Sequence, residues 1–208
     1  MSRPIIDAGP ALNFFSLNRE RLLFQVAGAL STPETVREEI LRKASQDPRF
    51  QAAERVVKKL PEKYLEILSD GDSPDLRHTV ERLTDHSFNE LTPRTKNAGE
   101  TMAIAHAALL AERGQDAFLL MDDFPARQIV AQENRRLARL HTQGRKRTSC
   151  PRIIVIGTAD ILTRAVREHV IGSRAELKKL YLRMRELDDG LLPFDQSDLP
   201  QLFRRPPG

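Results

Sequence analysis

Two short apolar runs in the sequence end in acidic residues. The run Pro4–Ile6 ends in Asp7, and the run Ala117–Met121 ends in Asp122 and Asp123. Runs of this length are typical of buried strands. In open sheets of parallel strands, ligands bind beyond the carboxyl ends of the strands. We therefore expect these carboxylates to meet at one edge of a sheet, although more than a hundred residues separate them.

Two glutamates on predicted helices are further candidates. In the segment TPETVREEI, Glu39 follows Val36 by three residues and adjoins Ile40, so it leans toward the packed side of a helix, whereas Glu38 points elsewhere. Glu100 lies at the start of a nearly all-apolar helix. It stands three residues after Asn97, which is the spacing of a capping box. Glu39 is therefore an edge charge or a ligand, and Glu100 is a cap or a ligand.

The strand-end aspartates also have structural interpretations. Asp123 is placed to cap the helix that Pro125 helps to start, and Asp122 suits a turn. However, adjacent carboxylates repel each other unless a cation or a base lies nearby. Asp122 and Asp123 therefore either stabilise a turn and a helix start or form part of a cation site.

The acids become more informative when they are considered as a set. Carboxylates converging from four segments need divalent cations to offset their charge, and such hard oxygen ligands suit magnesium or manganese. A site of this kind is typical of phosphodiester hydrolysis. The only cysteine, Cys150, excludes an internal disulfide and a thiolate zinc site, and the five histidines lack the paired spacing of zinc hydrolases. The four converging acids are Asp7, Glu39, Glu100 and Asp123.

The order of elements predicts how these acids are positioned. Strands alternate with helices up to a last buried strand in RIIVIG, which indicates an α/β fold with a parallel sheet. Helical spacing over residues 11–29 predicts one helix after the first strand. We expect a single domain over residues 1–208, with a helical insertion at about 42–95 and a tail from about 187.

Composition points to a soluble protein with a polyanionic partner. The chain is 40% hydrophobic and 30% charged, and no apolar run approaches the ~20 residues that span a bilayer. The start MSRPIID has no signal-peptide core, so we expect a cytoplasmic protein without a membrane partner. The net charge of +4 favours a polyanion.

Positive charge concentrates between Arg135 and Arg152, a stretch that contains no acidic residue. This pattern fits a solvated helix end followed by a basic loop, and it fits equally a contact with a phosphate backbone. The candidate nucleic-acid-binding residues are Arg135, Arg136, Arg139, Arg145, Lys146 and Arg147.

An ordered set of motifs resembles a known family. The segments IIDAGPALNFF, TPETVREEI, AGETMAIAHA, LLMDDFPAR and VIGTADIL, in this order, resemble the motifs of PIN-domain nucleases, particularly bacterial and archaeal ones in which Gly-Thr follows the last strand. The resemblance covers most of the chain outside residues 42–94 and the basic segment after Asn134. It implies a three-layer α/β/α fold with a central, mainly parallel sheet and a helical insertion.

The resemblance also implies roles for single residues. The family's first aspartate matches Asp7, and its helix glutamate matches Glu39, with Glu38 as the alternative register. Its third acid matches Glu100, where glutamate stands in place of the usual aspartate. Its fourth matches Asp123, with Asp122 as an auxiliary ligand. The implied metal ligands are Asp7, Glu100, Asp123 and Asp122, with Glu39 binding directly or through water.

The function implied by the resemblance is metal-dependent endonucleolytic cleavage of RNA. One or two Mg²⁺ or Mn²⁺ ions would lower the pKa of the attacking water and stabilise the leaving oxygen. Many small proteins of this family are toxins paired with an antitoxin protein, and many form homodimers, so both partners are expectations here. The alternative is a PIN-like RNA- or protein-binding module with little hydrolysis.

Overall fold

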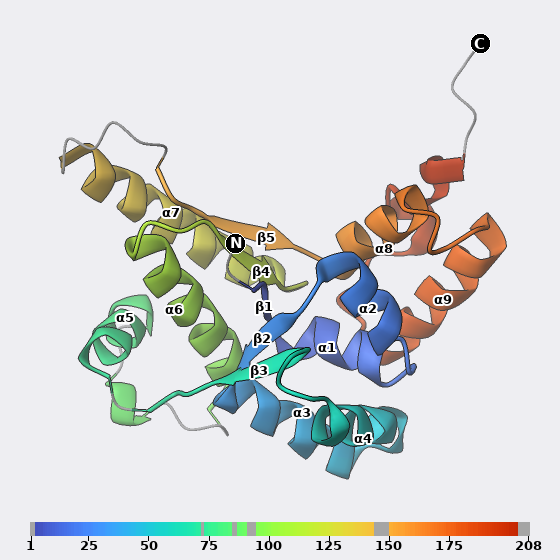
Figure 1. The fold of residues 1–208 in the computed structure, drawn as a ribbon, viewed down its shortest axis with the longest axis horizontal. Helices are drawn as coiled ribbons and strands as arrows, with labels where there is room; N and C mark the ends of the chain where they lie inside the picture. The colour runs from blue at the N-terminus through green and yellow to red at the C-terminus, as the bar shows by residue number, and fades with distance from the viewer. Residues whose placement is uncertain (1–2, 72, 85–86, 91–94, 144–149, 204–208) are drawn as a thin grey trace.

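The chain folds around one five-stranded, all-parallel sheet whose strand order is β3-β2-β1-β4-β5. The computed structural model describes residues 3–203 except 72, 85–86, 91–94 and 144–149. Figure 1 shows the twisted sheet at the centre of the molecule with helices on both sides. The predicted three-layer α/β/α architecture is therefore confirmed, and no strand pair of the described residues is antiparallel.

The strands and helices alternate along the chain. The strands are β1 (Ile5–Ile6), β2 (Leu30–Pro33), β3 (Leu65–Leu68), β4 (Ala117–Leu120) and β5 (Ile153–Ile156). The α-helices of the described residues are α1 (Ala8–Phe15), α2 (Glu20–Ala27), α3 (Glu34–Gln46), α4 (Gln51–Lys59), α5 (Pro74–Thr84), α6 (Ala98–Glu112), α7 (Phe124–Gln143), α8 (Thr158–Arg167) and α9 (Arg174–Leu187). Short 3₁₀ helices are η1 (Pro48–Phe50), η2 (Phe88–Glu90), η3 (Phe194–Gln196) and η4 (Leu199–Phe203).

The central strands are buried on both faces, which explains their continuous apolar sequences. Ile5 and Ile6 of β1 are almost completely buried, and they pair with Leu119 and Leu120 of β4. On the other side, Ile5 pairs with Ser31 of β2. This register aligns the carboxyl ends of β1 and β4, so the residues that follow them emerge at the same edge.

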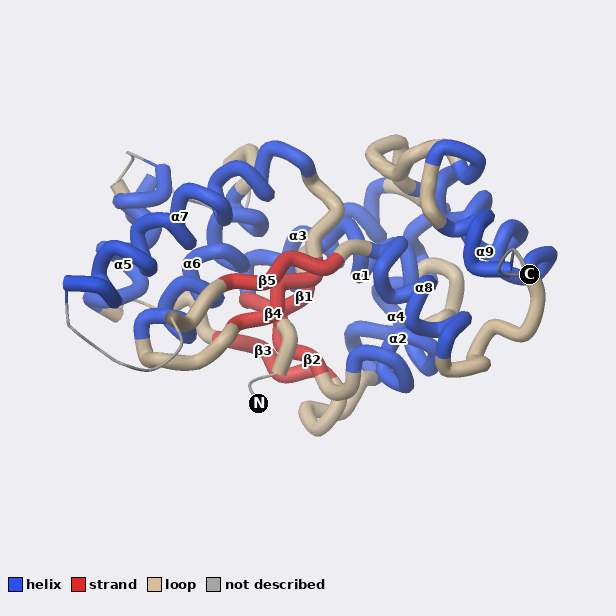
Figure 2. Tube along the Cα trace, turned by 90° about the horizontal axis from the view of Figure 1, so that it is seen from above, coloured by secondary structure: helices blue, strands red, loops and turns tan. Residues whose placement is uncertain are grey.

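Two groups of helices enclose the sheet. Figure 2 shows α5, α6 and α7 on one side and α1, α2, α8 and α9 on the other. Helix α6 packs against β1, β2, β4 and β5, and its alanine-rich sequence gives it small side chains that allow this close approach. Helix α3 contacts both α1 and α6, so it joins the two groups at the edge where β1 ends.

Three expectations about element boundaries differ from the structure. The segment 11–29 forms two helices, because the chain turns between them at Asn18, which has a φ of 52°. The range 42–95 holds β3, an edge strand of the sheet, in addition to α4 and α5. The segment after residue 187 contains η3 and η4, and it buries Leu191 and Phe194 in the main core.

Within the described residues, no helix combines the length and the apolar character that crossing a membrane requires.

Candidate functional site

The predicted acids line one cleft beyond the carboxyl ends of β1 and β4. This cleft, which we call the acidic cleft, encloses about 440 Å³. Its walls come from the starts of α1, α6 and α7, from α3 and from the segment after α9. The structure therefore brings together all of the carboxylates that the sequence singled out. The acidic residues in its lining are Asp7, Glu39, Glu100, Asp122, Asp123 and Asp188.

Asp7 occupies the floor of the acidic cleft, directly after β1. Its backbone N–H donates to the carbonyl of Leu120 at 3.0 Å, which holds it in register with β4. Asp7 is the N-cap residue of α1, but its side chain makes no capping hydrogen bond. The net effect of its surroundings raises the pKa of Asp7 to about 7: partial burial is the largest cause and the Glu39 carboxylate adds to it, whereas the nearby backbone of Ala8 and Gly9 and the ammonium of Lys43 oppose the rise. Asp7 is thus a partly buried carboxylate whose charge the protein compensates only in part.

Glu39 reaches the acidic cleft from the middle of α3. Its Oε1 lies 2.8 Å from Nζ of Lys43, one turn further along the helix. A side-chain carbon added at Gly99 would lie 2.6 Å from Oε2 of Glu39, so the start of α6 passes directly over this carboxylate. Glu38 is exposed and absent from the cleft lining. The choice of Glu39 over Glu38 therefore agrees with the structure.

Glu100 does not belong to a capping box. Asn97 has left-handed backbone geometry, with a φ of 62°, and its side chain makes no capping hydrogen bond to α6. Glu100 instead lines the acidic cleft. Burial, together with the smaller contributions from the charges of Asp123, Asp7 and Glu39, raises the pKa of Glu100 to about 7. The capping explanation is therefore wrong, and Glu100 is electrostatically coupled to the other acids.

Asp122 ties the end of β4 to the start of α8. Its Oδ1 accepts a 2.7 Å hydrogen bond from the backbone N–H of Thr158, and its Oδ2 accepts one of 2.5 Å from the Thr158 hydroxyl. Asn13 donates to the same Oδ2 at 3.5 Å. Burial raises the pKa of Asp122, although the hydrogen bonds from Thr158 act against it. Both oxygens of Asp122 are therefore engaged by protein donors.

Asp123 caps α7, as the structural interpretation predicts. Its Oδ1 accepts a 2.9 Å hydrogen bond from the backbone N–H of Ala126. The side chain is exposed at the mouth of the acidic cleft, and its second oxygen, Oδ2, takes no part in that bond. Capping one helix and contributing to the cleft are therefore compatible roles for the two oxygens.

Asp188 is a cleft residue that the sequence interpretation missed. It follows α9, in the segment assigned to the tail. Its Oδ2 accepts a 3.0 Å hydrogen bond from Asn13, and its Oδ1 accepts one of 2.9 Å from the backbone N–H of Gly190. Asn13 is completely buried, and it links Asp188 to Asp122 through one amide group. The only signal in the sequence was the acidic pair Asp188-Asp189 before Gly190.

The acids lie in one cleft without forming a preassembled coordination shell. Within the described residues, no three His, Cys, Asp or Glu side chains are close enough together to hold a metal ion. Contacts with other protein groups explain why the carboxylates lie apart. Glu39 pairs with Lys43, Asp122 accepts hydrogen bonds from Thr158, and Asp123 accepts one from the start of α7. Carboxylates without a cation between them also repel one another.

The basic segment divides into residues with different surroundings. Arg136 binds Glu133 and Glu112, and Arg82 of α5 binds the same Glu133. The side chain of Glu133 is only 3% exposed, and although burial raises its pKa, hydrogen bonds from Arg136 and Arg82 hold the pKa below its ordinary value. Arg136 therefore joins α5, α6 and α7 as part of an internal ion network.

Arg135 and Arg139 instead lie on the exposed side of α7. Neither side chain makes an ion pair with another described residue. The remaining predicted nucleic-acid-binding residues, Arg145, Lys146 and Arg147, lie outside the described residues.

Neighbouring arginines should respond differently to substitution. Arg136→Gln is expected to lower the free energy of unfolding by about 1–3 kcal/mol, because a buried carboxylate loses a charged partner. Arg135→Gln, on the exposed face, is expected to change it by less than about 0.5 kcal/mol. Chemical denaturation of both variants at pH 7 measures the difference. Equal stability of the two variants would contradict the ion network.

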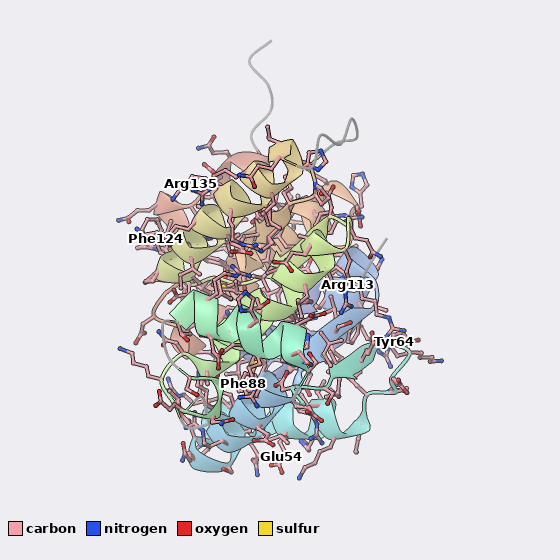
Figure 3. All side chains as sticks on the ribbon, turned by 90° about the vertical axis from the view of Figure 1, so that its left-hand side faces the viewer. Glu54, Tyr64, Phe88, Arg113, Phe124 and Arg135 are labelled. Carbon is pink, nitrogen blue, oxygen red and sulfur yellow. The ribbon has the colours of Figure 1, made fainter. Side chains whose placement is uncertain are left out.

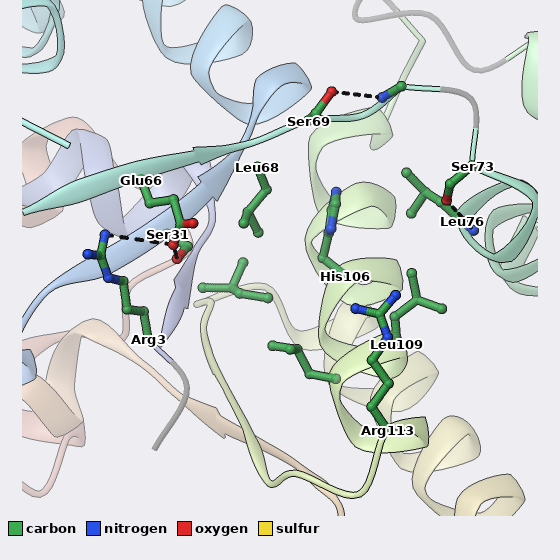
Figure 4. A pocket seen from close by; sticks show the side chains of 13 residues that line it. Arg3, Ser31, Glu66, Leu68, Ser69, Ser73, Leu76, His106, Leu109 and Arg113 are labelled. Atoms are coloured by element: carbon green, nitrogen blue, oxygen red, sulfur yellow. Dashed lines mark hydrogen bonds and ion pairs between the residues drawn. The ribbon is translucent and has the colours of Figure 1, made fainter. Parts of the chain in front are cut away.

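A second cavity, of about 680 Å³, lies beside the edge strand β3 and helix α6 (Figure 4). Its charged groups are largely paired, since Arg3 lies 3.7 Å from Glu66 and His106 lies 2.8 Å from Asp70. Glu66 is the only carboxylate among its described lining residues, and leucines form much of the wall. This cavity offers no cluster of hard ligands, and we place the chemistry in the acidic cleft.

Comparisons of the chain with models of protein families, with curated proteins and with solved structures give no match.

Proposed function

We propose that the protein is a metal-dependent endoribonuclease of the PIN type, which hydrolyses RNA phosphodiesters in the acidic cleft. The observation that carries the proposal is the convergence of six carboxylates at the carboxyl edge of a parallel sheet. Two of them, Asp7 and Glu100, have pKa values raised to about 7. Acids in a cleft whose pKa values are shifted by burial and by specific neighbouring charges are candidates for functional residues.

The chemistry of the donor set fits a hard divalent cation. Carboxylate oxygens are the ligands that Mg²⁺ and Mn²⁺ prefer, and a cation would offset the repulsion that raises the pKa of Glu100. Asp7, Glu100 and Asp123 would hold it, with Glu39 and Asp122 at the margin because protein donors already engage them. When bound, the cation would lower the pKa of the attacking water and stabilise the leaving oxygen.

The residues of the chain supply positioning and charge balance. Asn13 and Thr158 fix Asp122, and Asp122 thereby anchors the end of β4, from which Asp123 projects. Lys43 is the only lysine among the described residues of the cleft lining, and its ammonium balances Glu39. An RNA phosphate carries negative charge, so the carboxylates would repel it unless a cation and Lys43 offset them.

A second candidate function is an RNA- or protein-binding module with little hydrolysis. Two observations favour it: no three metal-ligating side chains of the described residues are ready to coordinate one ion, and Lys43 neutralises Glu39 internally. Against it, the cleft keeps carboxylates such as Asp7 whose charge the protein compensates only in part, and whose partial removal from water is costly without a cation. The nuclease is therefore the stronger proposal.

RNA cleavage by the purified protein separates the two functions. A pool of single-stranded and structured RNAs is incubated with the protein in EDTA, in Mg²⁺ or in Mn²⁺. We expect endonucleolytic products with either metal ion and none in EDTA. Salt-sensitive RNA binding without cleavage under any of these conditions would favour the binding module. Absence of both activities would leave a protein partner as the ligand of the cleft.

An antitoxin partner and a homodimer remain predictions that rest on the resemblance. If an antitoxin exists, it would act by blocking the acidic cleft.

A further inference from the structure

Phe124 stands at the mouth of the acidic cleft with an unusual exposure. It is the first residue of α7, it follows Asp123 directly, and it lines the cleft. Its relative exposure of 70% is the largest among the exposed large hydrophobic residues of the described chain. Its ring makes no contact with another described aromatic ring or cation. The ring is therefore available to a ligand that enters the cleft.

The rest of α7 continues the same exposed face. At 100° per residue, Phe124, Gln128, Arg135 and Arg139 fall within one sector of about 60° on the helix. All four are exposed. The opposite face holds the buried residues Ala126, Val130, Glu133 and Leu137. Figure 3 shows Phe124 and Arg135 along the same side of α7.

This face has the composition of a single-strand binding surface. Proteins bind single-stranded nucleic acids by combining positive charges along the backbone with aromatic rings on which bases stack. Phe124 supplies a ring beside the carboxylates, and Arg135 lies about 16 Å further along α7 at 1.5 Å per residue. Arg139 extends the positive charge by one more turn. The spacing covers several nucleotides of a strand.

We propose that Phe124 stacks an unpaired nucleobase of the RNA next to the scissile phosphate, while Arg135 and Arg139 contact phosphates of the same strand. The inference rests on the proposed ribonuclease function and names its substrate class as single-stranded RNA. In a duplex, the faces of the bases are covered by their neighbours, so the ring of Phe124 has no base to receive. Phe124 is thus a specificity residue at the cleft.

An isolated exposed apolar residue by itself needs no explanation. Phe124 differs because it borders a strongly polar cleft and shares a face with cationic side chains. Leu140, at the far end of α7, is also exposed, at 48%, but it lies outside the cleft lining. Leu140→Ala is therefore a matched control for the loss of an exposed apolar side chain from the same helix.

Cross-linking tests the proposal without depending on hydrolysis. Single-stranded RNA that carries 5-iodouridine is mixed with the protein in Ca²⁺, a hard cation that offsets the carboxylates of the cleft, and irradiated, and the attachment site is mapped by mass spectrometry. We expect attachment at Phe124, its loss in Phe124→Leu, and its retention at this position in Phe124→Tyr. The affinity measured by fluorescence anisotropy should fall about tenfold in Phe124→Leu and stay unchanged in Leu140→Ala.

Three results would overturn the stacking proposal: no attachment at Phe124, equal attachment to a duplex of the same sequence, or unchanged affinity in Phe124→Leu. If Phe124 binds a partner protein and not RNA, no RNA will be attached at Phe124. Cross-linking at Phe124 without cleavage in any metal would uphold the stacking and refute the nuclease. Metal-dependent cleavage that Phe124→Leu leaves unchanged, without attachment at Phe124, would uphold the nuclease and refute the stacking.

Discussion

Replacing Asp7 by asparagine is expected to reduce RNA cleavage by more than about 100-fold. Loss of a residue that only supports a metal ligand costs up to about 100-fold, and Asp7 is proposed as a direct ligand. Asparagine has nearly the same shape, so the fold and the hydrogen bond from the backbone N–H of Asp7 to Leu120 are retained. The change removes the charge at the centre of the acidic cleft. Cleavage rates with saturating Mg²⁺ or Mn²⁺ measure the effect.

Asp195→Asn is the matched control for this experiment. Asp195 is an exposed aspartate of η3, outside the acidic cleft, and its replacement changes the net charge by the same amount. We expect Asp195→Asn to cleave RNA like the unmodified chain. Cleavage by Asp7→Asn at an undiminished rate would show that the acidic cleft is not the site of RNA cleavage, whether or not the reaction needs a metal ion.

The metal-free protein is expected to lose stability as the pH rises from about 4 through 7. Folding raises the pKa of Asp7 from 3.8 to about 7, so the folded state binds this proton more tightly than the unfolded state. A group of this kind favours folding fully below its unfolded pKa, and the contribution disappears as the pH rises through the folded pKa. Glu100 acts in the same direction. The slope from Asp7 alone would reach about 1.4 kcal/mol per pH unit.

A divalent cation should reverse this loss, because it binds the deprotonated carboxylates. Thermal denaturation between pH 5 and pH 8, in EDTA and in Mg²⁺, measures both effects. We expect Mg²⁺ to raise the melting temperature more at pH 8 than at pH 5. Asp7→Asn should be the more stable protein in EDTA at pH 8, and it should show a smaller response to Mg²⁺. Identical pH profiles for Asp7→Asn and the unmodified chain would contradict the raised pKa of Asp7.

The fold was predictable because local signals agreed with the global pattern. Apolar runs such as Ile153–Ile156, separated by helices, indicate a parallel sheet without further information. The parallel direction places the ends of β1 and β4 at the same edge of the sheet, whereas their pairing and register are seen only in the structure. The early helix was misjudged because the apolar spacing continues through Asn18, and only the left-handed backbone at that residue reveals the turn.

The candidate site was predictable where a residue follows a strand, as Asp7 and Asp123 do. Asp188 was not, because its position depends on how the segment after α9 folds back to Asn13, and a side-chain contact between such distant segments leaves no local pattern. The same holds for Arg136, since its acidic partners include Glu112 of α6. The capping box at Glu100 failed because sequence spacing cannot reveal the left-handed backbone of Asn97.

We expect the acidic cleft to hold the divalent cation, and equilibrium binding of Mn²⁺ measured by electron paramagnetic resonance tests this expectation most directly. The unmodified protein and Asp195→Asn should each bind one or two ions per chain, and Asp7→Asn should lose at least one of them. Competition with Mg²⁺ should displace the same ions. Equal Mn²⁺ binding by Asp7→Asn and the unmodified protein, or no binding by either, would contradict the account.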